Sequence, residues 1–208
     1  MRILFGSFVI ALLAALSTVA LPLGRADLRA FEARSLMQSW SAKERVPSAA
    51  EWSQARDALM TAHRLDSAQP AYLEDLGRLY EARGDLQQAL ESQRAALARR
   101  PGSPYTWSNI ALLKARLAKP DAEFERALQN AALLGPWEPG VQSMLADAGF
   151  AQWGALAPPM QAVVRANAAR ALRWQDKNVI EIARRHGRLD VLCGLPEMRL
   201  SPNAGACI

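Results

Sequence analysis

The side chains that most often carry chemistry in proteins are scattered along this sequence. The only two histidines, His63 and His186, are far apart, and neither belongs to an H-E-x-x-H metal motif. The chain has no G-x-S-x-G nucleophile turn, no G-x-x-x-x-G-K phosphate loop and no strand-turn-helix dinucleotide signature. The acidic pairs Glu74-Asp75 and Glu123-x-Glu125 have the spacing of solvated helix surfaces. We therefore predict that the protein is not an enzyme, with no catalytic residues, no cofactor and no metal site.

The only two cysteines, Cys193 and Cys207, lie near the C-terminus. In an oxidising compartment they could close a short loop as a disulfide. The alternative is a buried free Cys193 in the apolar run Val191-Leu192-Cys193, with Cys207 as a reactive thiol. The sequence leaves both interpretations open.

Positive charge is concentrated at the C-terminal end. Residues 159–208 contain eight Lys or Arg against four Asp or Glu, and so carry +4 of the formal net charge of +5. One interpretation is that Arg184, Arg185 and Arg188 form a surface for lipid head groups, a carrier lipid or an acidic partner. The other is a solvated helix face whose arginines are favoured by the helix dipole. Nucleic acid is not expected as a partner, because the basic residues are not interleaved with aromatic residues in a recognisable module.

The elements that must position these residues are helices that repeat in pairs. Residues 70–101 read PAYLEDLGRLYEARGDLQQALESQRAALARRP, with small residues at Gly77, Ala89 and Ala96 and a turn at Gly84-Asp85. This spacing is that of the tetratricopeptide repeat, in which two antiparallel helices approach closely at the small residues. One such hairpin cannot bury its apolar face alone, so neighbouring units are expected.

Both neighbouring stretches carry parts of the same pattern. When the pattern of residues 70–101 is moved forward by one repeat, Trp107 and Ile110 fall on its apolar positions. Ser103-Pro104 predicts a helix that starts near Pro104. A backward shift gives a helix that the capping box Ser48-Ala-Ala-Glu51 opens, preceded by an atypical first helix at about residues 27–42. The pattern decays after about residue 150.

The start of the chain predicts a membrane anchor. Residues 3–23 are almost wholly apolar and carry no charge, which is enough to cross a hydrocarbon core as a helix. A cleavable signal peptide is the alternative, since Arg2 supplies a positive start, but the apolar run is long for one. The positive-inside rule alone would place the residues after the span in the cytoplasm. The very short tail before the span, and the general translocation of long domains regardless of charge, favour a body outside the cytoplasm. We adopt the second orientation.

The predicted fold is all-α: an N-terminal transmembrane helix, then a tetratricopeptide-like helical-hairpin solenoid with C-terminal capping helices. The predicted segments are a signal-anchor helix at 1–24, repeats at 25–156 with best units at 70–103 and 104–138, and basic C-terminal helices with an irregular tail at 157–208. In the last segment Pro158-Pro159 open a helix that runs to Trp174, a further helix covers about 176–186, and irregular chain follows Pro196. Trp137 is expected to pack across the joint between repeats.

Stacked helical hairpins form a concave groove lined by residues of each first helix. The repeat pattern assigns the following residues to this groove: Glu74, Arg78 and Glu81 from one unit, and Tyr105, Ser108, Leu112 and Arg116 from the next. The lining is mixed in charge and does not identify a particular peptide.

Three parts of the sequence are similar to a narrower family: 101–107 with 111–116, 135–139 and 183–193. They resemble the small membrane-anchored repeat proteins of bacterial exopolysaccharide biosynthesis, the polysaccharide-biosynthesis accessory proteins. This resemblance implies a non-enzymatic scaffold or adaptor of the bacterial inner membrane, with a single span and its body in the periplasm. Its partners would be proteins of a polysaccharide assembly or ligation system. Two alternatives stay open: a general envelope scaffold for cell-wall or secretion complexes, and an accessory protein that binds a carrier lipid or sugar through the basic C-terminal helices.

Overall fold

The computed structural model describes residues 2–207, and the side chains of residues 2–16 and of residue 19 lie outside this description. Within the described residues all regular secondary structure is helical, which confirms the predicted all-α class. The chain divides into two compact units, unit 1 at residues 1–84 and unit 2 at residues 85–208. The boundary lies in the turn predicted at Gly84-Asp85, where Gly84 takes a left-handed conformation with φ of 86° and ends the preceding helix.

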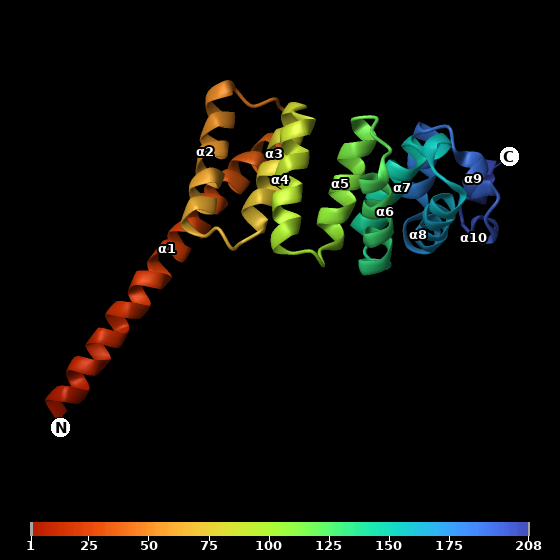
Figure 1. Cartoon of the computed structure of the whole chain (residues 1–208). Coiled ribbons are helices and arrows are strands. Elements are labelled where there is room, and N and C mark those ends of the chain that lie inside the picture. Colours follow the sequence, from red (N-terminus) through yellow and green to blue (C-terminus); the bar gives the residue numbers. More distant parts are fainter. Residues whose placement is uncertain (1, 208) are drawn as a thin grey trace. The chain divides into compact units, whose positions relative to one another are not determined.

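Unit 1 contains three helices, α1 (Arg2–Ala42), α2 (Ala49–Leu65) and α3 (Ala71–Arg83). Helix α1 is continuous over 41 residues, with Pro22 inside it, and its N-terminal part extends well beyond α2 and α3 (Figure 1). Among the described residues, none of the helices combines the length and apolar character that a membrane crossing requires. The span predicted at 1–24 falls mainly on the side chains that lie outside the description.

Small side chains bring α1 and α2 together. Ala26, Ala30 and Ala33 recur along one face of α1 and are fully buried, and alanines allow helix axes to approach closely. The first helix predicted at about 27–42 is therefore the second half of α1. The capping box predicted at Ser48 is present, since its hydroxyl accepts from the Glu51 amide and the Glu51 carboxylate accepts from the Ser48 amide.

Unit 2 contains seven α-helices among its described residues. They are α4 (Leu86–Arg99), α5 (Pro104–Arg116), α6 (Ala122–Leu134), α7 (Pro139–Ala151), α8 (Pro158–Arg185), α9 (Leu189–Cys193) and α10 (Pro196–Arg199), with 3-10 turns at Trp153–Ala155 and Ala204–Cys207. Helix α5 starts at Pro104, as predicted, and forms a hairpin with α6 (Figure 1). Ile110, Phe124 and Leu128 are completely buried in this part of the core.

Helices α7 and α8 form the next pair. A Cβ atom on Gly149 would lie 2.5 Å from Val164 Cγ2, so glycine is what permits this close approach. Helix α8 is interrupted at Gln175, whose φ of −145° and ψ of 45° are not helical. This break corresponds to the boundary predicted between a helix ending at Trp174 and a second one from about residue 176.

Two local predictions were wrong. Trp137 does not pack across a joint between repeats: it is 62% exposed. The chain beyond Pro196 is not irregular throughout, because Pro196 opens the short helix α10, in which Met198 is buried. A proline at the first position of a helix favours this start, because its fixed φ suits the first turn and its missing amide hydrogen is not needed there.

Candidate functional site

The predicted groove residues fall in both units, three on α3 and four on α5. On α3, Arg78 is exposed and forms an ion pair with Asp75, while Glu74 and Glu81 are half-buried. Asp75 is only 1% exposed and also accepts a 2.7 Å bond from Arg34 of α1. The spacing of Asp75 is that of a surface charge, but Asp75 is the buried carboxylate that joins α3 to α1.

The four residues of α5 are not equally accessible. Tyr105 is 43% exposed, Leu112 is half-buried and Arg116 is exposed. Ser108 is fully buried and donates to the Tyr105 carbonyl at 2.9 Å, so Ser108 does not belong to a groove lining. The Tyr105 hydroxyl donates to Glu138 at 3.0 Å, and partial burial together with this carboxylate raises the pKa of Tyr105.

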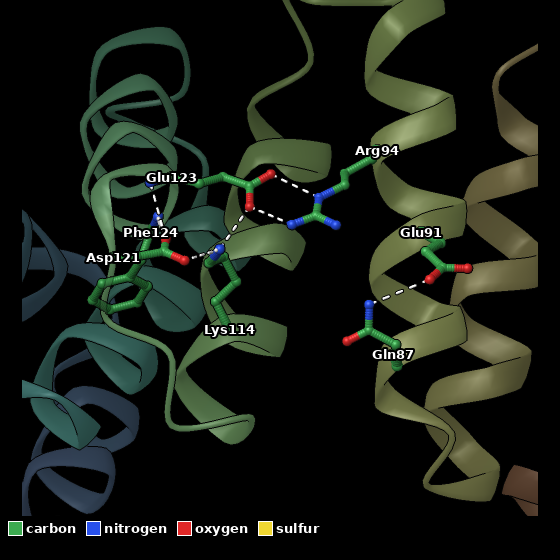
Figure 2. Close-up of polar contacts among 7 residues, drawn as sticks. All are labelled: Gln87, Glu91, Arg94, Lys114, Asp121, Glu123 and Phe124. Carbon is green, nitrogen blue, oxygen red and sulfur yellow. Dashed lines mark hydrogen bonds and ion pairs between the residues drawn. The ribbon is translucent and has the colours of Figure 1, made fainter.

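A charged network joins α4, α5 and α6 in unit 2 (Figure 2). Lys114 of α5 is only 2% exposed, and its Nζ lies 2.7 Å from Asp121 and 2.6 Å from Glu123. Arg94 of α4 binds both oxygens of Glu123, at 2.8 and 2.5 Å. Asp121 also caps α6, because its side chain accepts from the amides of Glu123 and Phe124.

The cations of this network shift the titration of its carboxyl groups. Arg94, with a further contribution from Lys114, lowers the pKa of Glu123 to about 2. Lys114 is the main cause of the lowered pKa of Asp121. The network therefore stays charged down to acidic pH and holds three helices together. Glu123 is not the solvated surface charge that its spacing suggested.

Arg184 and Arg185 at the basic C-terminal end each lie near a carboxylate of the protein. Arg184 lies 2.6 Å from Glu181, and Arg185 lies 3.8 Å from Asp147, while Arg188 donates a long 3.5 Å bond to the Gly187 carbonyl. Two of the three arginines predicted to bind anions thus face a carboxylate of the protein. This arrangement gives less support to an anion-binding surface than the sequence did.

The second histidine, His186, pairs with a carboxylate. His186 Nε2 lies 2.5 Å from the Asp147 carboxylate, although the two residues are 39 positions apart. This pair joins the end of α8 to α7. Among the described residues, no three ligand-type side chains are placed so that they could hold a metal ion.

The C-terminal tail is held by a covalent bond and by hydrogen bonds. Cys193 and Cys207 form a disulfide with a Cα–Cα distance of 5.7 Å, within the usual range. Ser201 and Asn203 both donate to Asp176, at 2.7 and 2.8 Å, and these bonds lower the pKa of Asp176. The tail is therefore folded back against α8.

Unit 1 also contains a pocket that the sequence analysis did not find. Its volume is about 820 Å3, within the range of roughly 300–1,000 Å3 typical of ligand pockets. It is lined by the end of α1, the loop that follows, the start of α2 and the end of α3: Met37, Trp40, Ser41, Glu44, Arg45, Val46, Pro47, Ser48, Ala49, Trp52, Leu79, Ala82 and Arg83. We call this cavity the α1–α3 pocket.

Two tryptophans, Trp40 and Trp52, line the α1–α3 pocket. Trp52 donates to the Leu79 carbonyl at 3.4 Å, and the guanidinium of Arg83 lies 4.4 Å from the centre of its ring. Trp40 is only 5% exposed, and its indole N–H has no hydrogen-bond acceptor among the described residues. The signal that could have revealed the pocket is a tryptophan on each side of the polar loop 43–48.

Comparison with family models and with curated proteins does not assign the chain to a family. No protein-family model matches the chain, and no curated protein is significantly similar to it in sequence.

Proposed function

We propose that this protein is a non-enzymatic, membrane-anchored adaptor that supports bacterial polysaccharide biosynthesis by binding other proteins. In this proposal the fold is a tetratricopeptide-like solenoid, residues 1–24 span the inner membrane once, and the body lies in the periplasm. The polysaccharide pathway rests on the sequence resemblance at 101–107 with 111–116, at 135–139 and at 183–193.

The observation that carries the anchored adaptor is the continuity of α1. This helix runs without interruption from Arg2 to Ala42, and Ala26, Ala30 and Ala33 in its second half are fully buried in unit 1. An apolar span at residues 3–23 would then be part of the same continuous helix as the first helix of the repeats. Such an element suits a protein whose body must be held at a fixed place beside a membrane partner.

Membrane attachment and partner identity can be tested together. The full chain, with an affinity tag after Ile208, is purified from mild-detergent membranes, and the co-purifying proteins are identified by mass spectrometry. We expect an uncleaved N-terminus and recovery of transferases, polymerases or export subunits of a polysaccharide system. A mature protein that begins near residue 25 in the soluble periplasmic fraction would contradict the anchor. Recovery of cell-wall or secretion components alone would contradict the pathway.

The exposed face of α5 supplies the variant for the binding step. Combined Tyr105→Ala and Arg116→Glu substitutions should reduce recovery of the partner, because both side chains reach solvent on α5. Arg126→Glu, an equal charge reversal at an exposed position of α6, is the matched control and should retain the partner. Equal recovery with both variants would show that the α5 face is not the binding surface.

A further inference from the structure

One face of α1 stays apolar beyond the apolar run at residues 3–23. Leu28 is 69% exposed and Phe31 is 68% exposed, and the exposed Leu21 precedes them at the spacing of the same helix face. This face lies opposite the one that carries the buried Ala26. We call Leu21, Leu28 and Phe31 the outward stripe. Because most of each side chain is exposed, unit 1 itself does not cover the stripe.

The apolar extension is confined to this one face. On one flank of the stripe, Asp27 accepts a 2.8 Å hydrogen bond from Tyr72 of α3. On the other flank, Arg29 lies 3.1 Å from Glu32. The next position of the stripe itself, Ser35, is polar and exposed. A helix that left an apolar medium upright would become polar on every side at the same height, so an extension on one face is the pattern of a helix that leaves obliquely.

Arg25 marks the height at which polar surface begins. It is the first charged residue after the apolar run, it is exposed, and it forms no ion pair with a carboxylate of the described residues. Arg25 lies about 3 Å beyond Leu23 along the helix axis, and the head group layer of a bilayer reaches about 5–7 Å beyond the hydrocarbon. Basic side chains at this depth attract lipid phosphates. Arg25 therefore favours a phospholipid surface as the partner of the stripe beside it.

A second copy of the chain fits this face poorly. Two anchored copies would run parallel, and contact along the stripe would arrange their helices as a parallel two-stranded coiled coil. The positions that flank the stripe would then bring Asp27 of one copy to Glu32 of the other. Arg25 would meet Ala20, which offers no opposite charge. Like charges on one side of each helix and an unpaired cation oppose this arrangement.

We propose that the outward stripe of α1 lies in the phospholipid head group layer of the membrane that holds residues 3–23, with the guanidinium of Arg25 at the lipid phosphates. Phe31 lies about 12 Å beyond Leu23 along the axis. A lean of about 35° towards the stripe brings Phe31 within about 7 Å of the hydrocarbon, and tilts of roughly 0–40° are usual for membrane helices. This inference rests on the proposed membrane anchor and adds to it the side on which unit 1 meets the bilayer.

The test measures the depth of nitroxide spin labels on the full chain, with one chain in each nanodisc of phosphatidylethanolamine and phosphatidylglycerol. Both native cysteines are in the disulfide, so the label reacts with the single cysteine introduced by Leu23→Cys, Leu28→Cys, Phe31→Cys or Ser35→Cys. Collision rates with oxygen and with a water-soluble nickel complex report the depth of each label. We expect the label at position 23 in the hydrocarbon, those at positions 28 and 31 within about 7 Å of its edge, and the label at position 35 in water.

The Leu23→Cys and Ser35→Cys variants separate this inference from the anchor. Ser35 is the matched control for Phe31, because it is exposed on the same face about one turn further along α1. A label at position 31 that lies in water, like the one at position 35, would overturn the inference and leave the anchor intact. A label at position 23 that lies in water would overturn the anchor, on which both proposals rest. Equal helix content by circular dichroism verifies that the four variants are folded.

Photocrosslinking in native membranes identifies what the stripe touches. The full chain carries p-benzoylphenylalanine in place of Phe31, which exchanges one exposed aromatic side chain for another, and mass spectrometry identifies the adducts after irradiation. We expect phospholipid adducts from position 31 and none when the same group replaces Ser35. Crosslinks from position 31 mainly to a second copy, or mainly to another protein, would overturn the inference without contradicting the anchor.

Discussion

Replacing Glu123 by glutamine should weaken unit 2 at neutral pH and remove part of its sensitivity to acid. The wild-type carboxylate lies between Arg94 and the buried Lys114, and glutamine keeps the shape but removes the charge. Lowering the pKa of Glu123 from 4.5 to about 2 corresponds to about 3 kcal/mol of preferential stabilisation of the charged form. Solvent screening around the half-exposed Arg94 reduces this to about 2 kcal/mol.

The pH dependence follows from the direction of the shift. Because the pKa of Glu123 is depressed in the folded state, the unfolded chain takes up the proton first as the pH falls. The stabilisation is therefore complete above about pH 4.5 and is lost as the pH falls towards about 2. The Glu123→Gln variant lacks this term, so its stability should differ from the wild type by about 2 kcal/mol at pH 7 and by little at pH 2.

The assay is urea unfolding of the full chain, monitored by hydrogen exchange of peptides from α5 and α6. Glu125→Gln is the matched control, since Glu125 is also half-buried on α6 but lies outside the network. A loss below about 0.5 kcal/mol at pH 7, or an equal loss at pH 2 and pH 7, would refute the reasoning. An equal effect of Glu125→Gln would show that the loss comes from α6 generally and not from the ion pairs.

Two further substitutions and the reduction of the disulfide test other contacts. Asp75→Asn should destabilise unit 1 by about 2–4 kcal/mol, because it leaves two arginines without a buried carboxylate, and faster hydrogen exchange in α3 would reveal it. Gly149→Ala should cost about 1–3 kcal/mol through the clash with α8, measured as a lower urea midpoint. Gly154→Ala is its control, since a Cβ there meets nothing within 4 Å. Reduction of Cys193–Cys207, 14 positions apart, should destabilise the tail by about 3 kcal/mol, read by hydrogen exchange.

Each of these three predictions has a result that would contradict it. Unchanged exchange in α3 after Asp75→Asn would mean that the ion pairs do not stabilise unit 1. Equal midpoints for the two glycine variants would mean that α7 and α8 separate easily. Unchanged exchange of the tail after reduction would mean that the bonds to Asp176 hold it without the disulfide.

The helices and several of their ends could be predicted from sequence because their signals are local. The capping box at Ser48, the helix start at Pro104 and the break before Asp176 each depend on a few adjacent residues. The failure at Trp137 has a different origin. The burial of Trp137 depends on which helices pack over this side chain, and the residues next to Trp137 in the sequence do not determine that packing.

The contacts that matter most in the candidate sites join residues distant in sequence. Asp75 meets Arg34 from 41 positions away, and Arg94 meets Glu123 from 29 positions away. The sequence spacing of Asp75 and Glu123 is the same as that of ordinary surface charges. Packing between helices buries them, and sequence spacing does not report that packing. The α1–α3 pocket was missed for the same reason, since its lining comes from three helices and a loop.

The continuity of α1 also has a consequence for rotational phase. An α-helix turns about 100° and rises about 1.5 Å with each residue. Because α1 runs from Arg2 into the buried face at Ala26, a one-residue insertion after Gly24 would turn the helix before it about 100° relative to the rest of unit 1. Seven inserted residues would restore the angle to within about 20° while adding about 10 Å of length. In a membrane-anchored chain, the one-residue insertion would mainly change the direction in which the body faces. The seven-residue insertion would mainly change its height above the bilayer.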